Sequence, residues 1–152
     1  MTFETIMLDV DADAHVATIT LNRPEALNAF NRTMCDEMAQ AWQAVKHDDA
    51  VHAVVLRAAG DRAFSAGLDV KTPYGQPDNV WNHDDPGEAL SPKWQKMWKP
   101  VVCAVNGICT AGAVTAGTGG DSSQPIRPPA LEQATKSALA HTGGGKVTGT
   151  EV

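Results

Sequence analysis

Apolar and polar residues alternate along VATITL, residues 16–21, so that every second side chain from Ala17 to Leu21 shares one face. Residues 5–10 are also rich in β-forming types, and the polar run at 11–14 has the composition of a turn. Alternation with a period of two is typical of a strand with one buried face. The pattern therefore predicts a β-hairpin near the N-terminus.

A different period follows Asn31. Apolar residues there recur at three- and four-residue spacing, which places them on one side of a helix. They are Met34, Met38, Ala41, Trp42 and Val45. Asn31 is a suitable N-cap, and the acidic pair at 36–37 and the basic pair at 46–47 match the helix dipole. We predict a helix over residues 32–47 with one apolar stripe.

Two later stretches are apolar almost throughout, VHAVVLRA at 51–58 and VVCAVNG at 101–107. Continuous apolar runs of this length are typical of strands that are covered on both faces. Each run is followed by small residues that include glycine, FSAGLD at 64–69 and ICTAGA at 108–113. We therefore predict two buried strands that each lead into a turn with little side-chain cover.

The segment between these strands has another composition. Residues 71–90 are rich in Pro, Asn, Asp and Gly, which predicts a mobile excursion rather than a packed element. Ser91 as cap and Pro92 at the first helical position predict a short helix that runs to Trp98. No repeat with a fixed period connects these segments.

The last 39 residues, 114–152, differ from the rest of the 152-residue chain. They contain no aromatic residue but hold seven of the thirteen glycines. Such a segment gains little from burial and cannot offset its ordering entropy. We predict a folded core over residues 1–113 and a disordered, low-complexity tail over residues 114–152.

Charge and cysteine usage exclude several classes of protein. The net charge of -6 belongs to residues 1–113, and an acidic body favours neither nucleic acid nor an anionic membrane surface. The N-terminus lacks the basic and apolar regions of a signal peptide, and no apolar stretch is long enough to span a membrane. Three cysteines without a C-x-x-C pattern fit reduced, buried thiols. We expect a cytoplasmic protein.

The two bare turns could share a chemical task. A backbone N–H at the end of a strand is a fixed dipole, and two that converge can hold a developing negative oxygen. Small residues would let a ligand carbonyl approach the backbone closely. The alternative is that these glycines merely allow tight strand-to-helix turns.

Three stretches resemble, in order and at suitable separations, the signatures of the enoyl-CoA hydratase/isomerase, or crotonase, superfamily. They are LNRPEALNAF at 21–30, AFSAGLDV at 63–70 and KPVVCAVNGICTAGA at 99–113. The resemblance covers about residues 4–113. It implies an α/β fold, a spiral of β-β-α turns that is incomplete here, with acyl-CoA thioesters as substrates and an enolate intermediate. It implies no metal and no separate cofactor, because coenzyme A arrives as part of the substrate.

The resemblance also assigns the oxyanion hole. One N–H would come from Leu68, the residue after Gly67, and the other from Gly112. Small residues from Ser65 to Gly67 would leave the backbone bare, so that the Leu68 N–H faces the thioester oxygen.

Four further positions are assigned by the same resemblance. The carbonyl of Ala66 matches the one that meets the adenine of CoA, and Asn28 with Ala29 matches the segment that lines the CoA channel. Asp69 would brace the turn from behind, and its alternatives are capping the next helix or, less favoured, direct proton transfer. Trp94 and Trp98 could wall an acyl pocket.

The chain departs from the family pattern after Ala113. Hydratases of the superfamily carry a glutamate three residues after the oxyanion glycine, where this chain has Thr115, and Glu132 is a poor substitute. A truncated remnant that binds CoA weakly or pairs with other subunits is therefore the alternative, and an unrelated α/β domain is a third. The family implies trimers or pairs of trimers, assembled partly through a C-terminal region that is not recognisable here.

Other motifs are set aside. TGGGKVTG near the C-terminus lacks residues that a phosphate-binding P-loop requires. His47 and His52 lack a metal-binding spacing, and His83 lies in an acidic cluster of the predicted excursion.

Overall fold

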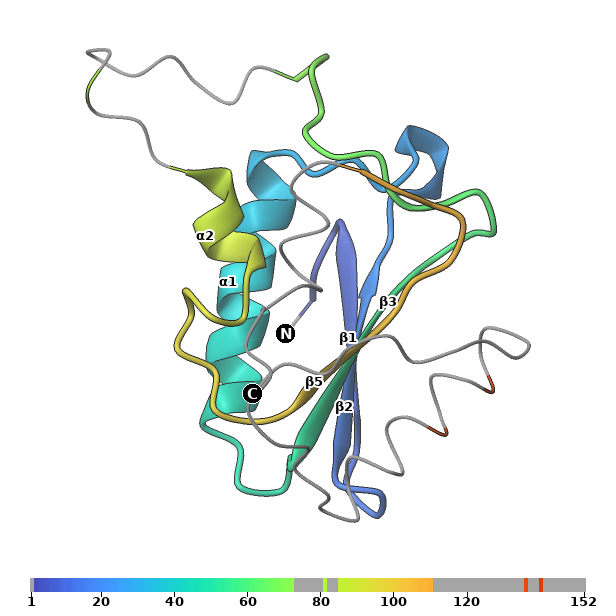
Figure 1. Ribbon diagram of the computed structural model, residues 1–152. Helices are drawn as coiled ribbons and strands as arrows, with labels where there is room; N and C mark the ends of the chain where they lie inside the picture. Colours follow the sequence, from blue (N-terminus) through green and yellow to red (C-terminus); the bar gives the residue numbers. More distant parts are fainter. Residues whose placement is uncertain (1, 73–80, 82–84, 111–135, 137–139, 141–152) are drawn as a thin grey trace, which may run out of the picture.

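The computed structural model describes residues 2–72, 81, 85–110, 136 and 140 (Figure 1). A four-stranded sheet has the order β1-β2-β3-β5. Its strands are β1 Ile6–Asp11, β2 Val16–Leu21, β3 Ala53–Ala58 and β5 Val101–Ala104. A mixed α/β arrangement, as the sequence predicts, results from helices α1 and α2 on one side of this sheet (Figure 1).

The predicted hairpin and both predicted buried strands are present. β1 and β2 pair in antiparallel fashion, with Ile6 opposite Leu21 and Asp11 opposite Val16. β3 pairs in parallel with β2 on one side and with β5 on the other, which makes it a central strand. Five of its six residues are buried, in agreement with the continuous apolar pattern.

The predicted helix is α1, Arg32–Lys46, and it covers one face of the sheet (Figure 1). The side chain of Asn31 accepts a hydrogen bond from the Met34 N–H at 2.9 Å, which confirms the N-cap. The predicted stripe is buried along its whole length. It forms the main core with apolar side chains of β2 and β3, among them Ile19 and Leu56.

Glu37 has a different task from the one its position in the sequence suggested. Its carboxylate accepts hydrogen bonds from the Glu4 N–H at 2.6 Å, the Thr5 N–H at 2.8 Å and the Thr5 hydroxyl. Burial alone would raise the pKa of Glu37, but these hydrogen bonds together outweigh burial and lower it. Glu37 thus joins α1 to the residues that lead into β1, rather than compensating the dipole of its own helix.

The opposite end of α1 is held by Lys99. Its Nζ donates to the carbonyl oxygens of Val45 and Asp48, each at 2.6 Å. Burial lowers the pKa of Lys99, although the charges of Asp48 and Asp49 oppose that effect. The C-terminal carbonyl groups of α1 are therefore joined to the residue pair that precedes β5.

The predicted helix at residues 92–98 is wrong, because the helix lies earlier. α2 spans Pro86–Leu90, with Asp85 as its N-cap, and the Ser91 N–H donates to Gly87 O at its end. After Pro92 the backbone makes one turn and stops, since Lys96 adopts a left-handed φ of 53°. Hydrogen bonds from Met97 N–H to Pro92 O and from Lys96 N–H to Lys93 O close that turn, the pattern of a Schellman motif.

α2 also limits the predicted excursion at 71–90. Leu90 is buried, and its carbonyl accepts a hydrogen bond from Trp42 Nε1 at 3.2 Å, so α2 is packed against α1. The prediction is therefore wrong for residues 86–90. Residues 73–80 and 82–84 lie outside the described residues, as does most of the predicted tail.

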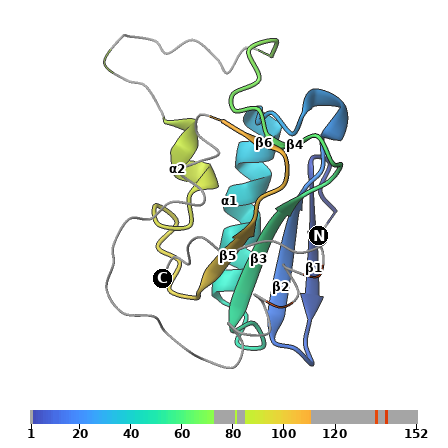
Figure 2. The same cartoon turned by 45° about the vertical axis from the view of Figure 1, so that its right-hand side comes forward.

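A second, smaller sheet completes the described fold. Strand β4, Ala63–Ser65, pairs in parallel with β6, Ile108–Cys109 (Figure 2). Each of β3 and β5 is thus followed by a short strand in the second sheet, so the chain repeats the same step. The remaining element is the 3-10 helix η1, Pro24–Ala26. No helix in the described part of the chain is both long and apolar enough to cross a membrane.

Replacing Glu37 with Gln should lower the free energy of unfolding by about 1–3 kcal/mol at pH 7, because one buried acceptor becomes a donor facing other donors. The lowered pKa of Glu37 means that the unfolded chain binds a proton first as pH falls. The difference between the variant and the parent chain should therefore shrink below about pH 4. Urea denaturation at pH 7 and at pH 3 measures the loss of stability at each pH, and the exposed Glu25→Gln variant is the control. An equal loss at both pH values would contradict the role of the charge.

Replacing Gly107 with Ala should destabilise the connection between β5 and β6. Gly107 has a φ of 63°, and a Cβ there would lie 2.3 Å from the carbonyl oxygen of Arg62. The strain of this φ and the overlap together should cost about 2–4 kcal/mol. Gly87→Ala is the control, because its Cβ meets only the Asp85 side chain, at 3.0 Å and beyond. Equal changes in melting temperature for the two variants would refute this explanation.

Candidate functional site

The loop after β4 is held against the segment that precedes α1. The Phe30 N–H donates to Gly67 O at 2.9 Å, and the Asp69 N–H donates to Phe30 O at 3.0 Å. These two bonds form an isolated parallel bridge between Phe30 and Leu68. The bridge joins the first and second of the three stretches that the sequence analysis singled out.

The bridge determines where the Leu68 N–H points. In a trans peptide the C=O and the N–H lie on opposite sides, and the described residues contain no cis peptide. Because Gly67 O faces Phe30, the Leu68 N–H of the same peptide must face away from it. That N–H has no acceptor among the described residues, and Leu68 is 42% exposed. The Leu68 N–H is therefore a backbone donor that points away from the segment around Phe30.

Gly67 makes this orientation accessible. Its φ is 90°, in the region that side-chain-bearing residues rarely adopt. This positive φ gives the glycine a structural cause, which is the alternative that the sequence left open. The part of the loop in an oxyanion hole stays a prediction.

β6 lies on the other side of the loop. The Thr110 N–H donates to Ser65 O at 3.1 Å, so the chain that leaves β6 begins next to the loop after β4. Gly112 lies two residues further on, outside the described residues. The convergence of the Leu68 and Gly112 N–H groups stays a prediction.

Asn28 is enclosed by the protein. It is 1% exposed with a φ of 52°, and its side-chain Nδ2 donates to Ala59 O and Ala63 O, both at 2.9 Å. Its Oδ1 accepts from the Arg23 N–H at 2.9 Å. Burial closes this side chain to a ligand, and neighbouring Ala29 is buried as well. Their predicted place in a CoA channel is untested, and it would have to involve their backbone.

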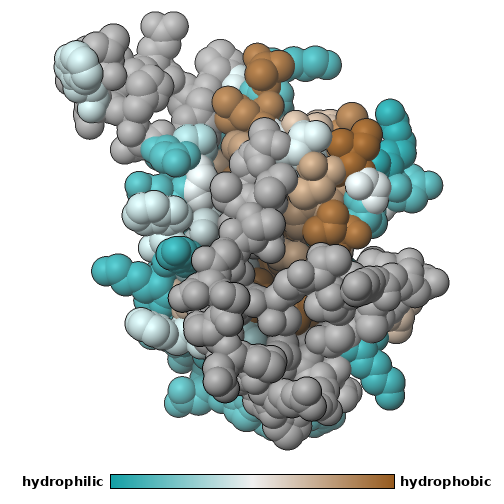
Figure 3. Space-filling model, in the orientation of Figure 1, coloured by the Kyte–Doolittle hydropathy of each residue, from teal (hydrophilic) through white to brown (hydrophobic). Residues whose placement is uncertain are grey.

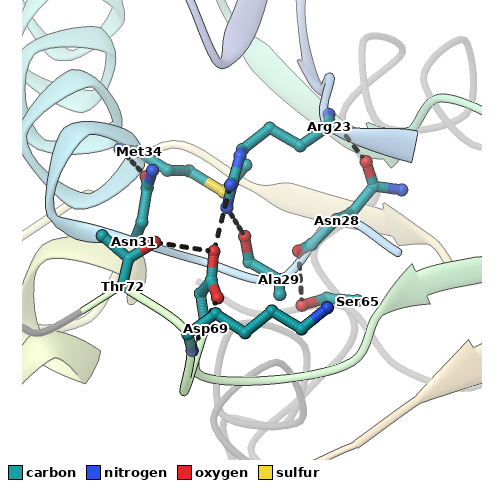
Figure 4. A network of polar contacts seen from close by, with 9 residues as sticks. Arg23, Asn28, Ala29, Asn31, Met34, Ser65, Asp69 and Thr72 are labelled. Atoms are coloured by element: carbon teal, nitrogen blue, oxygen red, sulfur yellow. Dashed lines mark hydrogen bonds and ion pairs between the residues drawn. The ribbon is translucent and has the colours of Figure 1, made fainter. Parts of the chain in front are cut away.

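Asp69 is bound from several directions (Figure 4). Arg23 Nη2 lies 3.0 Å from its Oδ2, while the Lys71 N–H and the Thr72 hydroxyl also donate to the carboxylate. Arg23, and then the Lys71 N–H, lower the pKa of Asp69. A carboxylate with a lowered pKa and this many donors is a weak base, and its contacts are those of a group that braces a turn.

Sequence analysis overlooked two residues of this network. Arg23 pairs with Asp69 and also donates from Nη1 to Ala29 O at 2.6 Å, joining both sides of the bridge. Ser65 was treated as bare, but its hydroxyl donates to Asn28 O at 2.8 Å and accepts from the Gly67 N–H at 3.2 Å. Both lie inside the quoted stretches. Ser65 stands two residues before the glycine, which is a weak signal, whereas Arg23 is 46 residues from Asp69 and no local pattern joins them.

Apolar side chains surround the outward face of this loop. Leu68, Val70, Val105 and Ile108 are between 42% and 89% exposed. Figure 3 shows apolar surface over the region where Figure 1 draws the loop after β4 and the segment that leads into β6. The Leu68 N–H thus belongs to a loop with exposed apolar side chains. Ala66, whose carbonyl the resemblance assigned to adenine, is half-buried in the same loop.

Other candidate residues lie away from this loop. Trp94 and Trp98 are 65% and 81% exposed, and neither lines the apolar cavity of about 20 Å³ between α1 and the sheet. The described residues include no group of three His, Cys, Asp or Glu side chains placed to hold a metal ion. Cys35, Cys103 and Cys109 are not joined in disulfides within the described part of the chain. Thr115, Glu132 and His83 lie outside the described residues.

Known proteins match the part of the chain that contains these residues. The family described as enoyl-CoA hydratase/isomerase matches residues 11–121. The chain is 39% identical over 111 residues to 1,2-epoxyphenylacetyl-CoA isomerase of Escherichia coli, covering 70% of this chain and 42% of that protein. It is 34% identical over 116 residues to crotonyl-CoA hydratase of Syntrophomonas wolfei, covering 74% and 43%.

Solved structures agree with the fold. An enoyl-CoA hydratase/isomerase from Mycobacterium paratuberculosis superposes with a TM-score of 0.60 at 40% identity, covering 75% of this chain and 42% of that one. The chain spans only 42% to 43% of the relatives named here, so the spiral of β-β-α turns is incomplete, as predicted. The bridged stretches and the three comparisons show that this chain belongs to the enoyl-CoA hydratase/isomerase family.

Proposed function

We propose that this chain binds an acyl-CoA thioester and polarises the thioester carbonyl with the backbone N–H of Leu68. The orientation of that N–H carries the proposal, since the bridge to Phe30 turns it away from the protein and leaves it without an acceptor among the described residues. The Gly112 N–H would be the second donor. Relatives named as CoA-thioester isomerases and hydratases support the choice of substrate class.

The chemistry follows from the charge that develops on the thioester oxygen. Removing a proton next to the carbonyl, or adding a nucleophile to a conjugated double bond, moves an electron pair onto that oxygen and gives an enolate. Fixed N–H dipoles stabilise the enolate more than the ground-state carbonyl, and losing one such donor costs about 100- to 1,000-fold in rate. Apolar surface around Leu68 would exclude water and strengthen this effect.

A second candidate function is binding without turnover. Proton transfer needs a poised acid or base, and Thr115 occupies the position where family hydratases carry a glutamate. Asp69 is engaged by Arg23 and has a lowered pKa, so it does not replace that group. The chain would then bind the CoA thioester without hydrating it. Assembly into trimers or pairs of trimers is a further prediction from the family.

The first experiment removes one donor at a time. Gly112→Pro and Leu68→Pro each delete an N–H, whereas Gly112→Ala and Leu68→Ala keep it and serve as matched controls. Each proline variant should lose about 100-fold or more of crotonyl-CoA hydration relative to its alanine control. Thermal protection by butyryl-CoA, which has no double bond to hydrate, measures binding separately.

Three outcomes separate the candidates. Protection together with hydration supports the enzyme, and protection without hydration supports the binding chain. Absence of protection at millimolar butyryl-CoA would overturn both. Proline variants as active as their alanine controls would contradict the assignment of the donors.

Replacing Asp69 with Asn tests its part in any turnover. The carboxylate is ionised throughout the neutral range because its pKa is lowered, so it should not shape the pH dependence there. Misplacing the loop should lower the hydration rate by up to about 100-fold with the pH profile unchanged. Loss of an ionisation from the profile would instead identify Asp69 as the base. Exposed Asp36→Asn is the control.

A further inference from the structure

We propose that the hydroxyl of Ser65 is a positioning group that, together with the bridge to Phe30, fixes the direction of the Leu68 N–H. This inference rests on the function proposed above and adds a residue that neither the resemblance nor the comparisons assign. Ser65 is 2% exposed, so its side chain cannot touch a bound thioester. Its effect must pass through the backbone of the loop.

The two hydrogen bonds of Ser65 give its hydroxyl a single orientation. A hydroxyl has one proton, and this one goes to Asn28 O at 2.8 Å. A lone pair is then presented to the Gly67 N–H, 3.2 Å away. If the proton pointed toward the Gly67 nitrogen, the hydroxyl could not accept from that N–H. The contact with Asn28 therefore converts a freely rotating group into a fixed acceptor.

The acceptor acts at the most adaptable residue of the loop. Gly67 has a φ of 90° and no side chain to restrict its neighbouring peptides. The peptide that precedes it is held by Ser65, and the peptide that follows it is held by the Phe30 N–H. The Leu68 N–H belongs to the second of these. With the Ser65 contact gone, the peptide before Gly67 would lose its own hydrogen bond, although the bridge to Phe30 would remain. The backbone at Gly67 could then vary more, and the direction of the Leu68 N–H would spread.

The anchor behind Ser65 is rigid. Asn28 is buried, and its side chain is hydrogen-bonded to Ala59 O, Ala63 O and the Arg23 N–H. Its carbonyl therefore has a fixed place relative to β4. Figure 4 shows the inner part of this chain of contacts, in which Arg23 meets Asn28 and Asn28 meets Ser65. From Ser65 it continues to the Gly67 N–H.

The test compares Ser65→Ala with Thr5→Ala and with the parent chain. Thr5 is also buried and also donates its hydroxyl, to Glu37 in α1, and it has no contact with the loop after β4 in the described hydrogen bonds. Thr5→Ala therefore controls for the loss of stability that follows from deleting a buried hydroxyl. The probe is butyryl-CoA with ¹³C at the thioester carbonyl, followed by difference infrared spectroscopy. Aligned donors that polarise the thioester carbonyl move its C=O stretching band to a lower frequency than in water.

We expect the band of the Ser65→Ala complex to broaden and to lose at least about half of its shift. Thr5→Ala should leave the band in place, and Ser65→Thr, which restores a hydroxyl, should recover it. A band in Ser65→Ala identical to that of the parent chain would overturn the proposal. If Ser65→Ala fails to fold, Ser65→Cys, with a weaker and longer hydrogen bond, must show a smaller loss of the same kind.

A second measurement separates this inference from the proposed function. If the parent chain shows no shifted band, the thioester function has failed, but amide exchange without ligand still tests Ser65. The Gly67 amide should exchange at least about tenfold faster in Ser65→Ala than in Thr5→Ala, because only the former loses its acceptor. Equal exchange in the two variants would overturn the positioning role.

Discussion

The pair of hydrogen bonds between Phe30 and the peptides on either side of Leu68 is the constraint on which the site depends. Because both peptides use their inward-facing atoms, the Leu68 N–H and C=O must face outward. The arrangement needs Phe30 in a fixed position. The next residue, Asn31, is the N-cap of α1 and ties this segment to the helix. The arrangement also needs a residue with positive φ at position 67, which glycine provides.

The rest of the described fold holds these two segments in place. Helix α1 is joined to the entry of β1 by Glu37 and to the entry of β5 by Lys99, so the sheet and the helix form one body. The second sheet brings β6 beside β4 next to the bridged loop. The family match extends over this framework, and the loop with the proposed first donor lies within it.

Local pattern predicted the elements whose burial is periodic. The hairpin, α1 and the buried strands follow from alternation, from the apolar stripe and from continuous apolar runs. The helix prediction at Ser91-Pro92 was wrong because Asp85 and Pro86 offer an equivalent start six residues earlier, and only the helix that begins there packs against Trp42. Ser65 and Glu37 were misjudged because their partners are 32 to 37 residues away in sequence. Sequence pattern reports neighbours along the chain, and these side chains act across the fold.

The amide resonance of Leu68 offers the most direct test of the central claim. In a ¹H–¹⁵N correlation spectrum, addition of butyryl-CoA should move the Leu68 amide proton downfield, since its N–H gains an acceptor. The Phe30 and Asp69 amides, which already donate within the bridge, should move much less. Saturating ligand that shifts other resonances but leaves the Leu68 amide unchanged would contradict the account.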